Sequence, residues 1–237
     1  MLELIAFDAD DTLWHTEHLY SDAEARLGQL LAPYGVTGPV EDQLFGVESA
    51  NLRFFGFGVK SFALSMIETA IKLTDGRITG PDVQRVIDLA KDMLSAEVAL
   101  LDHAQETIVA LAREFPLMII TKGDLLDQES KIERSGLGQH FQQIEIVSDK
   151  TPASYSALLG RHRLRPEGFL MVGNSLRSDV LPVLAIGGQA VHVPYALTWA
   201  HERVSPEELA GAHYAEIENL GQLPELIQRL KAEGPSA

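Results

Sequence analysis

The stretch from Leu4 to Leu13 constrains this chain most, because a short apolar run leads directly into a group of carboxylates. The run Leu-Ile-Ala-Phe has the length of a strand, and uninterrupted apolar runs suit strands buried on both faces of a parallel sheet. It is followed by Asp8, Asp10, Asp11 and Thr12. Crowded carboxylates raise the cost of ionising one another, whereas Mg²⁺ prefers such hard oxygen ligands. An Asp-rich turn after a strand is the alternative, since Asp is common in turns and helix caps.

Composition narrows the classes of protein that this chain can belong to. The 237 residues carry 34 acidic and 19 basic side chains, with a formal net charge of -15. This balance argues against a surface for nucleic acid or for an anionic membrane. The sequence has no Cys, which excludes disulfides, thiolate chemistry and Cys-based zinc sites. The start lacks the features of a secretion signal and no apolar stretch reaches the length of a membrane span, so we expect a cytoplasmic protein.

Residues 15–101 show helical periodicity and no strand pattern. Apolar residues recur at three- and four-residue spacing in roughly 19–34, 61–73 and 83–101, and the segment Thr79-Gly80-Pro81-Asp82 is typical of a helix N-terminus. The sequence therefore predicts three helices here, in a helical module inserted after the first strand.

From residue 102 onward, helical segments alternate with short apolar runs. These runs are 117–120, 144–147, 169–172 and 191–193. Alternation of this kind predicts parallel strands joined by right-handed crossovers. The expected fold is α/β, a doubly wound, Rossmann-like parallel sheet. We expect a core domain from 1–14 and 102–237, and a helical cap domain from 15–101.

Polar residues follow the first four apolar runs, counted from the run Leu4 to Phe7. The second run ends in Thr121 and Lys122, where a hydroxyl and exposed backbone amides could bind an anion. The third is followed by Lys150, and the fourth by Asn174 with Asp179 five residues later. Because parallel strands end at the same edge of a sheet, these side chains are expected to share one site with the carboxylates of the first run.

These four segments, in this order, resemble the four motifs of the haloacid dehalogenase-like hydrolase superfamily, phosphatase type. The first, Asp8 to Thr12, resembles its Asp-x-Asp-x-Thr motif, and the helical section lies where that family inserts a helical cap. The resemblance implies a magnesium-dependent phosphatase acting on a small phosphorylated metabolite.

The resemblance also implies a role for each matching residue. Asp8 would be the nucleophile that forms an aspartyl phosphate, and Asp10 the general acid and base. Thr121 and the Lys122 amide would bind the phosphoryl oxygens, while Lys150 would offset negative charge. Mg²⁺ would be bound by the Asp8 carboxylate and the Asp10 carbonyl, together with the residues of the fourth motif, Asn174 and Asp179.

Two residues depart from the family pattern. Asp11 stands where these proteins commonly have Gly, and it receives no catalytic role. Asn174 stands where phosphatases often have Asp; its oxygen can ligate Mg²⁺ but adds no charge, which predicts weaker metal binding with Asp179 as the main anionic ligand of this loop.

Several assignments stay open. Lys60, beside the aromatic segment 54–57, could reach the substrate from the cap or be a solvated lysine. Trp14 is expected to pack at the cap hinge, and Tyr195, Trp199 and His201 have no assigned role. Dehalogenase, phosphomutase and non-catalytic phospholigand-binding functions remain alternatives, although Asp10 argues against a dehalogenase, which needs no leaving-group acid. A monomer or a homodimer is expected.

Overall fold

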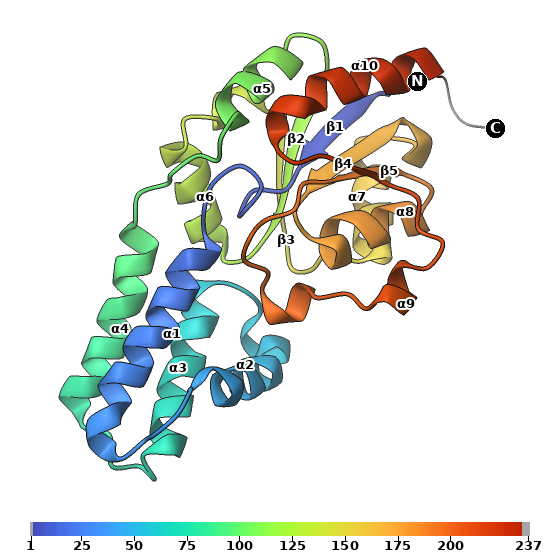
Figure 1. The fold of residues 1–237 in the computed structure, drawn as a ribbon. Helices are drawn as coiled ribbons and strands as arrows, with labels where there is room; N and C mark the ends of the chain where they lie inside the picture. Colours follow the sequence, from blue (N-terminus) through green and yellow to red (C-terminus); the bar gives the residue numbers. More distant parts are fainter. Residues whose placement is uncertain (1, 234–237) are drawn as a thin grey trace. The chain divides into compact units, whose positions relative to one another are not determined.

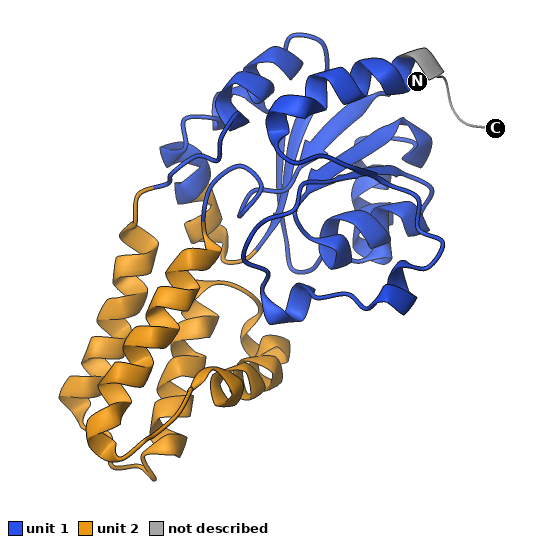
Figure 2. Ribbon diagram, in the orientation of Figure 1, with its two compact units in different colours: residues 1–15, 98–122, 130–237 blue, residues 16–97, 123–129 orange. Residues whose placement is uncertain are grey.

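The computed structural model describes residues 2–233, which divide into two compact units (Figure 2). The core unit consists of the described parts of Met1–His15, Val98–Lys122 and Ser130–Ala237. The helical unit consists of Thr16–Glu97 and Gly123–Glu129. The domain boundaries expected from the sequence place residues 123–129 in the core domain instead. The expected division into a core domain and a cap domain stays a prediction.

A parallel sheet in the order β3-β2-β1-β4-β5-β6 forms the centre of the core unit (Figure 1). Its strands are β1 (Leu4–Phe7), β2 (Leu117–Lys122), β3 (Gln143–Val147), β4 (Phe169–Gly173), β5 (Gln189–His192) and β6 (Ala215–Glu216). The chain runs outward in one direction from β1 to β3 and in the other from β4 to β6, so the order reverses between β1 and β4. The expected α/β fold with a doubly wound parallel sheet is confirmed. The crevice at such a reversal is where open α/β sheets bind ligands.

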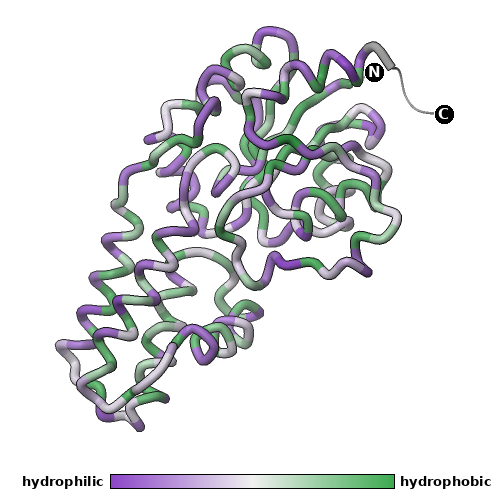
Figure 3. The backbone as a smooth tube through the Cα atoms, in the orientation of Figure 1, coloured by the Kyte–Doolittle hydropathy of each residue, from purple (hydrophilic) through white to green (hydrophobic). Residues whose placement is uncertain are grey.

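Both faces of β1 are covered, which explains why its sequence is apolar throughout. Ile5 and Phe7 pack in a cluster with α5 (Ala104–Leu111) and α10 (Leu223–Glu233). Leu4 and Ala6 pack in another cluster, with α7 (Pro152–His162) and Val183 of α8 (Leu181–Ala185). Figure 3 shows the hydrophobic strands against helices of mixed hydropathy. No helix within residues 2–233 is long and apolar enough to cross a membrane.

The helical unit contains four principal helices where the sequence predicts three. They are α1 (Glu17–Leu31), α2 (Glu41–Phe55), α3 (Val59–Leu73) and α4 (Gly80–Ser95), packed around a core of their own. Helix α2 is not predicted because Glu48 and Asn51 are buried on its inner face, where they interrupt the apolar periodicity. Asn51 donates to Ser65 and Glu68 of α3, at 3.2 and 2.9 Å, so its burial is matched by hydrogen bonds.

Candidate active site

The carboxyl edge of the sheet carries the candidate site, and the neighbouring strands supply its side chains. Asp8 directly follows β1, Thr121 and Lys122 end β2, and Lys150 follows β3. Asn174 directly follows β4 and precedes a π-helical turn, Leu176–Val180. This turn carries Asp179. All of these residues lie in the core unit.

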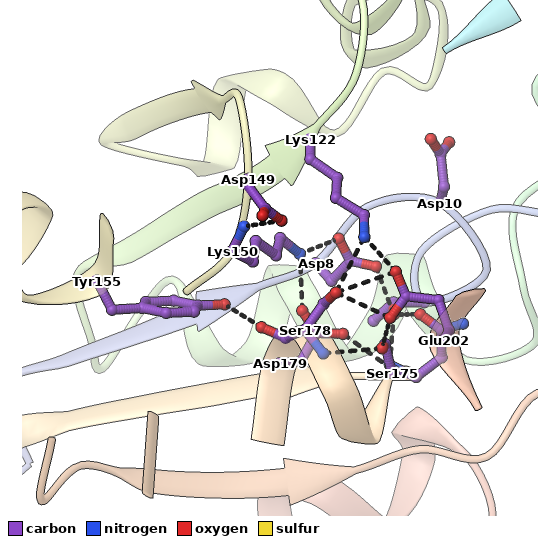
Figure 4. Close-up of polar contacts among 12 residues, drawn as sticks. Asp8, Asp10, Lys122, Asp149, Lys150, Tyr155, Ser175, Ser178, Asp179 and Glu202 are labelled. Carbon is purple, nitrogen blue, oxygen red and sulfur yellow. Dashed lines mark hydrogen bonds and ion pairs between the residues drawn. The ribbon is translucent and has the colours of Figure 1, made fainter. Parts of the chain in front are cut away.

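Lys150 lies between two buried carboxylates (Figure 4). Its ammonium group donates to Asp8 Oδ1 and, at 2.7 Å, to Asp179 Oδ1. The side chains of Lys150 and Asp179 are 2% and 1% exposed, and that of Asp8 is 11% exposed. Burial of these charges is tolerated because they are paired and hydrogen-bonded. Asp8, Lys150 and Asp179, predicted from the ends of separate strands, are thus in direct contact.

One ammonium cannot offset two buried carboxylates. Burial raises the pKa of Asp8 to about 7, although Lys150 draws it downward, and Asp179 and Asp10 raise it further. Burial also raises the pKa of Asp179. Burial alone would lower the pKa of Lys150, but Asp179 and Asp8 outweigh it and raise that pKa. The centre therefore lacks positive charge at neutral pH, and ionising Asp8 fully requires a further cation.

The turn after β4 fixes Asp179 through backbone contacts. Asp179 Oδ2 accepts from the Ser175 amide at 3.0 Å, and the Ser175 hydroxyl accepts from the Ser178 amide at 3.0 Å. Gly173 leaves the space that Asp179 occupies, since a Cβ there would lie 2.2 Å from Asp179 Oδ2. Both carboxylate oxygens of Asp179 thus have donors within the core unit.

Asn174 lies beside the nucleophile candidate. Turned with its amide nitrogen inward, it donates to Asp8 Oδ2 at 3.1 Å, the Asp10 carbonyl at 3.3 Å and Thr12 Oγ1 at 3.2 Å. Thr12 joins the same group, because its hydroxyl lies 3.3 Å from Asp8 Oδ2 and accepts from the Asn174 backbone amide at 3.0 Å. In the opposite orientation, the Asn174 side-chain oxygen faces the Asp8, Asp10 and Thr12 oxygens.

This group of oxygens fits a magnesium ion with few protein ligands. The described residues contain no cluster of three His, Cys, Asp or Glu side chains arranged for a metal. Mg²⁺ is commonly held by one or two carboxylates together with waters and substrate phosphates. Asp8 Oδ2, the Asp10 carbonyl and the Asn174 oxygen would provide such a set, and the ion would supply the missing positive charge.

Asp10 points to different partners and lies apart from the Lys150 network in Figure 4. Its Oδ1 accepts from Trp14 Nε1 at 2.8 Å, and Lys131 donates to Oδ1 and Oδ2 at 2.8 and 2.9 Å. The intervening Asp11 has a positive φ of 59° and its amide donates to the Trp14 carbonyl at 2.7 Å. This tight turn brings the Trp14 indole to Asp10, a contact beyond the packing role expected from the sequence.

The Lys122 side chain lies in a second polar cluster. It donates to Ser178 Oγ at 3.0 Å and pairs with Glu202. Glu202 also accepts from the hydroxyls of Ser175 and Ser178. Burial would raise the pKa of Glu202, but Lys122 and these hydrogen bonds outweigh it and lower that pKa. Trp199, near Lys122, contacts His201 with ring centroids 4.3 Å apart.

The remaining predicted residues are placed as follows. Thr121 is buried in β2 and lies opposite Ile146 of β3. Lys60 is in the helical unit, where it donates to Asp124 at 2.9 Å; its proposed contact with substrate stays a prediction. Lys131 and Glu202 are not among the predicted residues, because Lys131 lies within α6 (Leu125–Arg134) and Glu202 in a short 3-10 helix, Ala200–Glu202, both away from any strand end.

Comparison with known proteins establishes the family. The model of the haloacid dehalogenase-like hydrolases matches residues 2–187. A solved structure of a haloacid dehalogenase-like family hydrolase from Xanthomonas campestris is 40% identical, with a TM-score of 0.87, and the match covers 98% of this chain and 93% of that one. The chain therefore belongs to the haloacid dehalogenase-like hydrolase family, as the four motifs indicate.

Two more distant relatives share one description. A glyceraldehyde 3-phosphate phosphatase of Methanothermobacter thermautotrophicus is 24% identical over 96% of this chain and 100% of its own length. A glyceraldehyde 3-phosphate phosphatase of Pyrococcus furiosus is 27% identical, and the match spans 56% of this chain and 55% of that protein. The predicted hydrolase class agrees with these relatives.

Proposed function

We propose that the protein is a magnesium-dependent phosphatase that hydrolyses a small-molecule phosphomonoester through an aspartyl-phosphate intermediate. One observation carries the proposal: a buried, lysine-paired Asp8 is followed two residues later by a second positioned carboxylate, Asp10. Departure of an alcohol requires a proton donor, whereas departure of a halide does not. The phosphatase relatives support the same substrate class.

In the first step, Asp8 attacks phosphorus and the bond from phosphorus to the ester oxygen breaks. A proton from Asp10 goes to that oxygen, and the alcohol leaves. Lys150 stabilises the negative charge that gathers on the phosphoryl oxygens, with Thr121 and the Lys122 amide as further donors.

In the second step, a water molecule gives its proton to Asp10 and attacks the phosphorus of the aspartyl phosphate. The bond to Asp8 breaks, and inorganic phosphate and the free carboxylate result. A magnesium ion held by Asp8, the Asp10 carbonyl and Asn174 would supply positive charge to the phosphoryl oxygens. Asp179 holds Lys150 in place, and its role as a metal ligand stays a proposal.

A dehalogenase that works without metal is the second candidate. The observation that favours it is the donor orientation of Asn174, which satisfies the oxygens around Asp8 without a cation. In this case, Asp8 would attack the carbon that bears the halogen, and halide would leave with the bonding electrons. Release of halide from 2-chloropropionate, unchanged by chelation, would establish this alternative.

A phosphate-release screen over sugar phosphates, nucleotides and an aryl phosphate, with and without Mg²⁺, tests the phosphatase. We expect release only with Mg²⁺, and its loss in Asp8→Asn. Asp11→Asn is the matched control, because it removes one negative charge three residues away and Asn also tolerates positive φ. Activity that survives Asp8→Asn or chelation would refute the mechanism. Phosphate binding without release from any ester would favour a binding protein.

A further inference from the structure

His192, the last residue of β5, is a polar side chain buried at the carboxyl edge of the sheet, within the core unit. It is 8% exposed, and its neighbours in the chain, Val191 and Val193, are buried apolar residues. Both ring nitrogens have partners: Nδ1 lies 2.9 Å from Oε2 of Glu216 in β6, and Nε2 lies 3.0 Å from the backbone carbonyl oxygen of Asn174. Burial of an imidazole is costly unless its nitrogens are hydrogen-bonded, and these two contacts meet that requirement.

The chemistry of the two partners determines how the His192 ring binds. A backbone carbonyl can only accept a hydrogen bond, so Nε2 donates to the Asn174 carbonyl. The Glu216 carboxylate contacts the opposite side of the ring, and a carboxylate in this position holds an imidazole in one orientation. A chain of side-chain contacts thus runs from β6 through β5 to the residue that follows β4.

The carbonyl that His192 binds belongs to the peptide group between Asn174 and Ser175. The amide of the same peptide group, that of Ser175, donates to Asp179 Oδ2 at 3.0 Å. The Asn174 amide, which belongs to the preceding peptide group, donates to Thr12 Oγ1 at 3.0 Å. Because planar peptide groups leave only φ and ψ free at each residue, contacts to both flanking peptide groups restrict both angles of Asn174.

The direction of the Asn174 side chain follows from these backbone contacts. The two flanking peptide groups set the direction of the Cα–Cβ bond, and here the side-chain amide reaches to 3.1 Å from Asp8 Oδ2 and 3.3 Å from the Asp10 carbonyl. We propose that His192 is a positioning residue that holds Asn174 for Mg²⁺ binding. The proposal rests on the magnesium-dependent function given above, in which Asn174 is a ligand; His192 acts through the Asn174 backbone.

The size of the effect follows from the number of contacts that remain. Without the His192 ring, the Asn174 carbonyl loses its donor, but Asp179 still holds the Ser175 amide of the same peptide group. Partners that orient a metal ligand typically contribute about 10–100-fold to metal affinity. Since one contact to the peptide group persists, we expect a loss at the lower end of this range.

Calorimetric titration of the full chain with Mg²⁺, without substrate, measures this contribution separately from catalysis. In His192→Phe, which keeps an aromatic ring and removes both nitrogens, we expect the Kd for Mg²⁺ to rise by about 10-fold. In a phosphate-release assay, the Mg²⁺ concentration that gives half the maximal rate should rise by the same factor. The kcat at saturating Mg²⁺ should stay within about twofold of the unmodified protein, because the loss lies in ligand placement.

Three further variants separate positioning from a merely structural role. His192→Gln keeps an N–H donor near the place of Nε2 and should recover most of the Mg²⁺ affinity. His162→Phe is the matched control, because His162 also contacts a carboxylate, that of Glu145 in β3, with its own side chain 21% exposed; it should leave the Kd unchanged. If His192→Phe does not fold, as judged by urea unfolding, Glu216→Leu removes the more exposed partner that orients the ring and should raise the Kd by a smaller factor.

Each outcome bears on the proposal. An unchanged Kd in His192→Phe, or in Glu216→Leu where that variant is needed, would overturn the positioning role and leave the phosphatase function intact. The same holds for a Kd that His192→Gln does not recover, or a fall in kcat that saturating Mg²⁺ does not restore. If the unmodified protein binds no Mg²⁺, the magnesium-dependent function is refuted, and the role of His192 with it.

Discussion

Replacement of Lys150 by Met tests the buried charge centre quantitatively. The substitution removes the ammonium that Asp8 and Asp179 share and keeps an apolar stem of similar length. To remain buried, Asp179 must then take up a proton at a pH more than three units above its ordinary pKa of 3.8, which costs about 4 kcal/mol at neutral pH. Removal of one partner from a buried ion pair typically costs about 3–5 kcal/mol, so we expect a loss of this size in the free energy of unfolding.

The loss should depend on pH in a defined direction. Without Lys150, the carboxylates have pKa values raised further in the folded state, so the folded variant binds more protons than the unfolded chain. Its stability therefore rises as the pH falls. If the folded variant binds one proton more than the folded unmodified protein, the difference between their free energies of unfolding should shrink by about 1.4 kcal/mol for each pH unit from 7 towards 5.

Urea unfolding in the presence of a chelator, at pH 7, 6 and 5, measures both quantities. Lys91→Met is the matched control, because Lys91 pairs with Asp88 on the surface with its side chain 64% exposed, and such pairs contribute less than about 1 kcal/mol. A loss below about 1 kcal/mol for Lys150→Met, or one that does not change with pH, would refute the argument that these carboxylates depend on Lys150 for their burial.

Other predictions follow from single contacts. Asn174→Asp should tighten Mg²⁺ binding in a calorimetric titration, since it adds a charged ligand; unchanged affinity would count against Asn174 as a ligand. Gly173→Ala should cost about 1–3 kcal/mol in urea unfolding through overlap with Asp179, whereas Gly160→Ala, with open space within α7, should stabilise by about 0.5–1 kcal/mol. The pKa of Glu202 is lowered, so the unmodified protein should have a higher free energy of unfolding than Glu202→Gln. This difference should be full above pH 4.5 and should decline as the pH falls further. A difference in urea midpoint that stays constant with pH would contradict this.

The sequence predicts those site residues whose position follows from topology. Parallel strands joined by right-handed crossovers must end at one edge, so a polar residue after an apolar run is placed without knowledge of side-chain packing. Asp8, Lys150 and Asp179 illustrate this, because they follow β1, β3 and β4, which lie within four consecutive positions of the sheet. The same reasoning places Asn174 at this edge of the sheet, and in the structure it lies within reach of Asp8, Asp10 and Thr12.

Residues outside strand ends carry no such signal. Lys131 is an ordinary charge in the sequence of α6 (Leu125–Arg134), and its contact with Asp10 depends on which side of that helix faces the turn after β1. Glu202 ends a three-residue 3-10 helix, Ala200–Glu202, which is too short for residue spacing to predict either burial or partners. Helix α2 is missed for a related reason, since hydrogen bonding inside the helical unit allows polar residues on its buried face.

The two departures from the family motifs have different physical consequences. Asp11 occupies a left-handed conformation with φ of 59°, which Gly adopts without strain and which Asp tolerates better than most residues. Substitution of Gly by Asp at this position therefore preserves the turn that brings Trp14 to Asp10. Asn174, in contrast, exchanges a carboxylate for a group that can either accept or donate at the same oxygens. The residue at position 11 keeps the geometry of the turn, whereas the residue at position 174 changes the charge of the site. The dependence of this hydrolase on metal should therefore be decided at Asn174. Comparison of Asn174→Asp with the unmodified protein isolates the effect of the charge at this position.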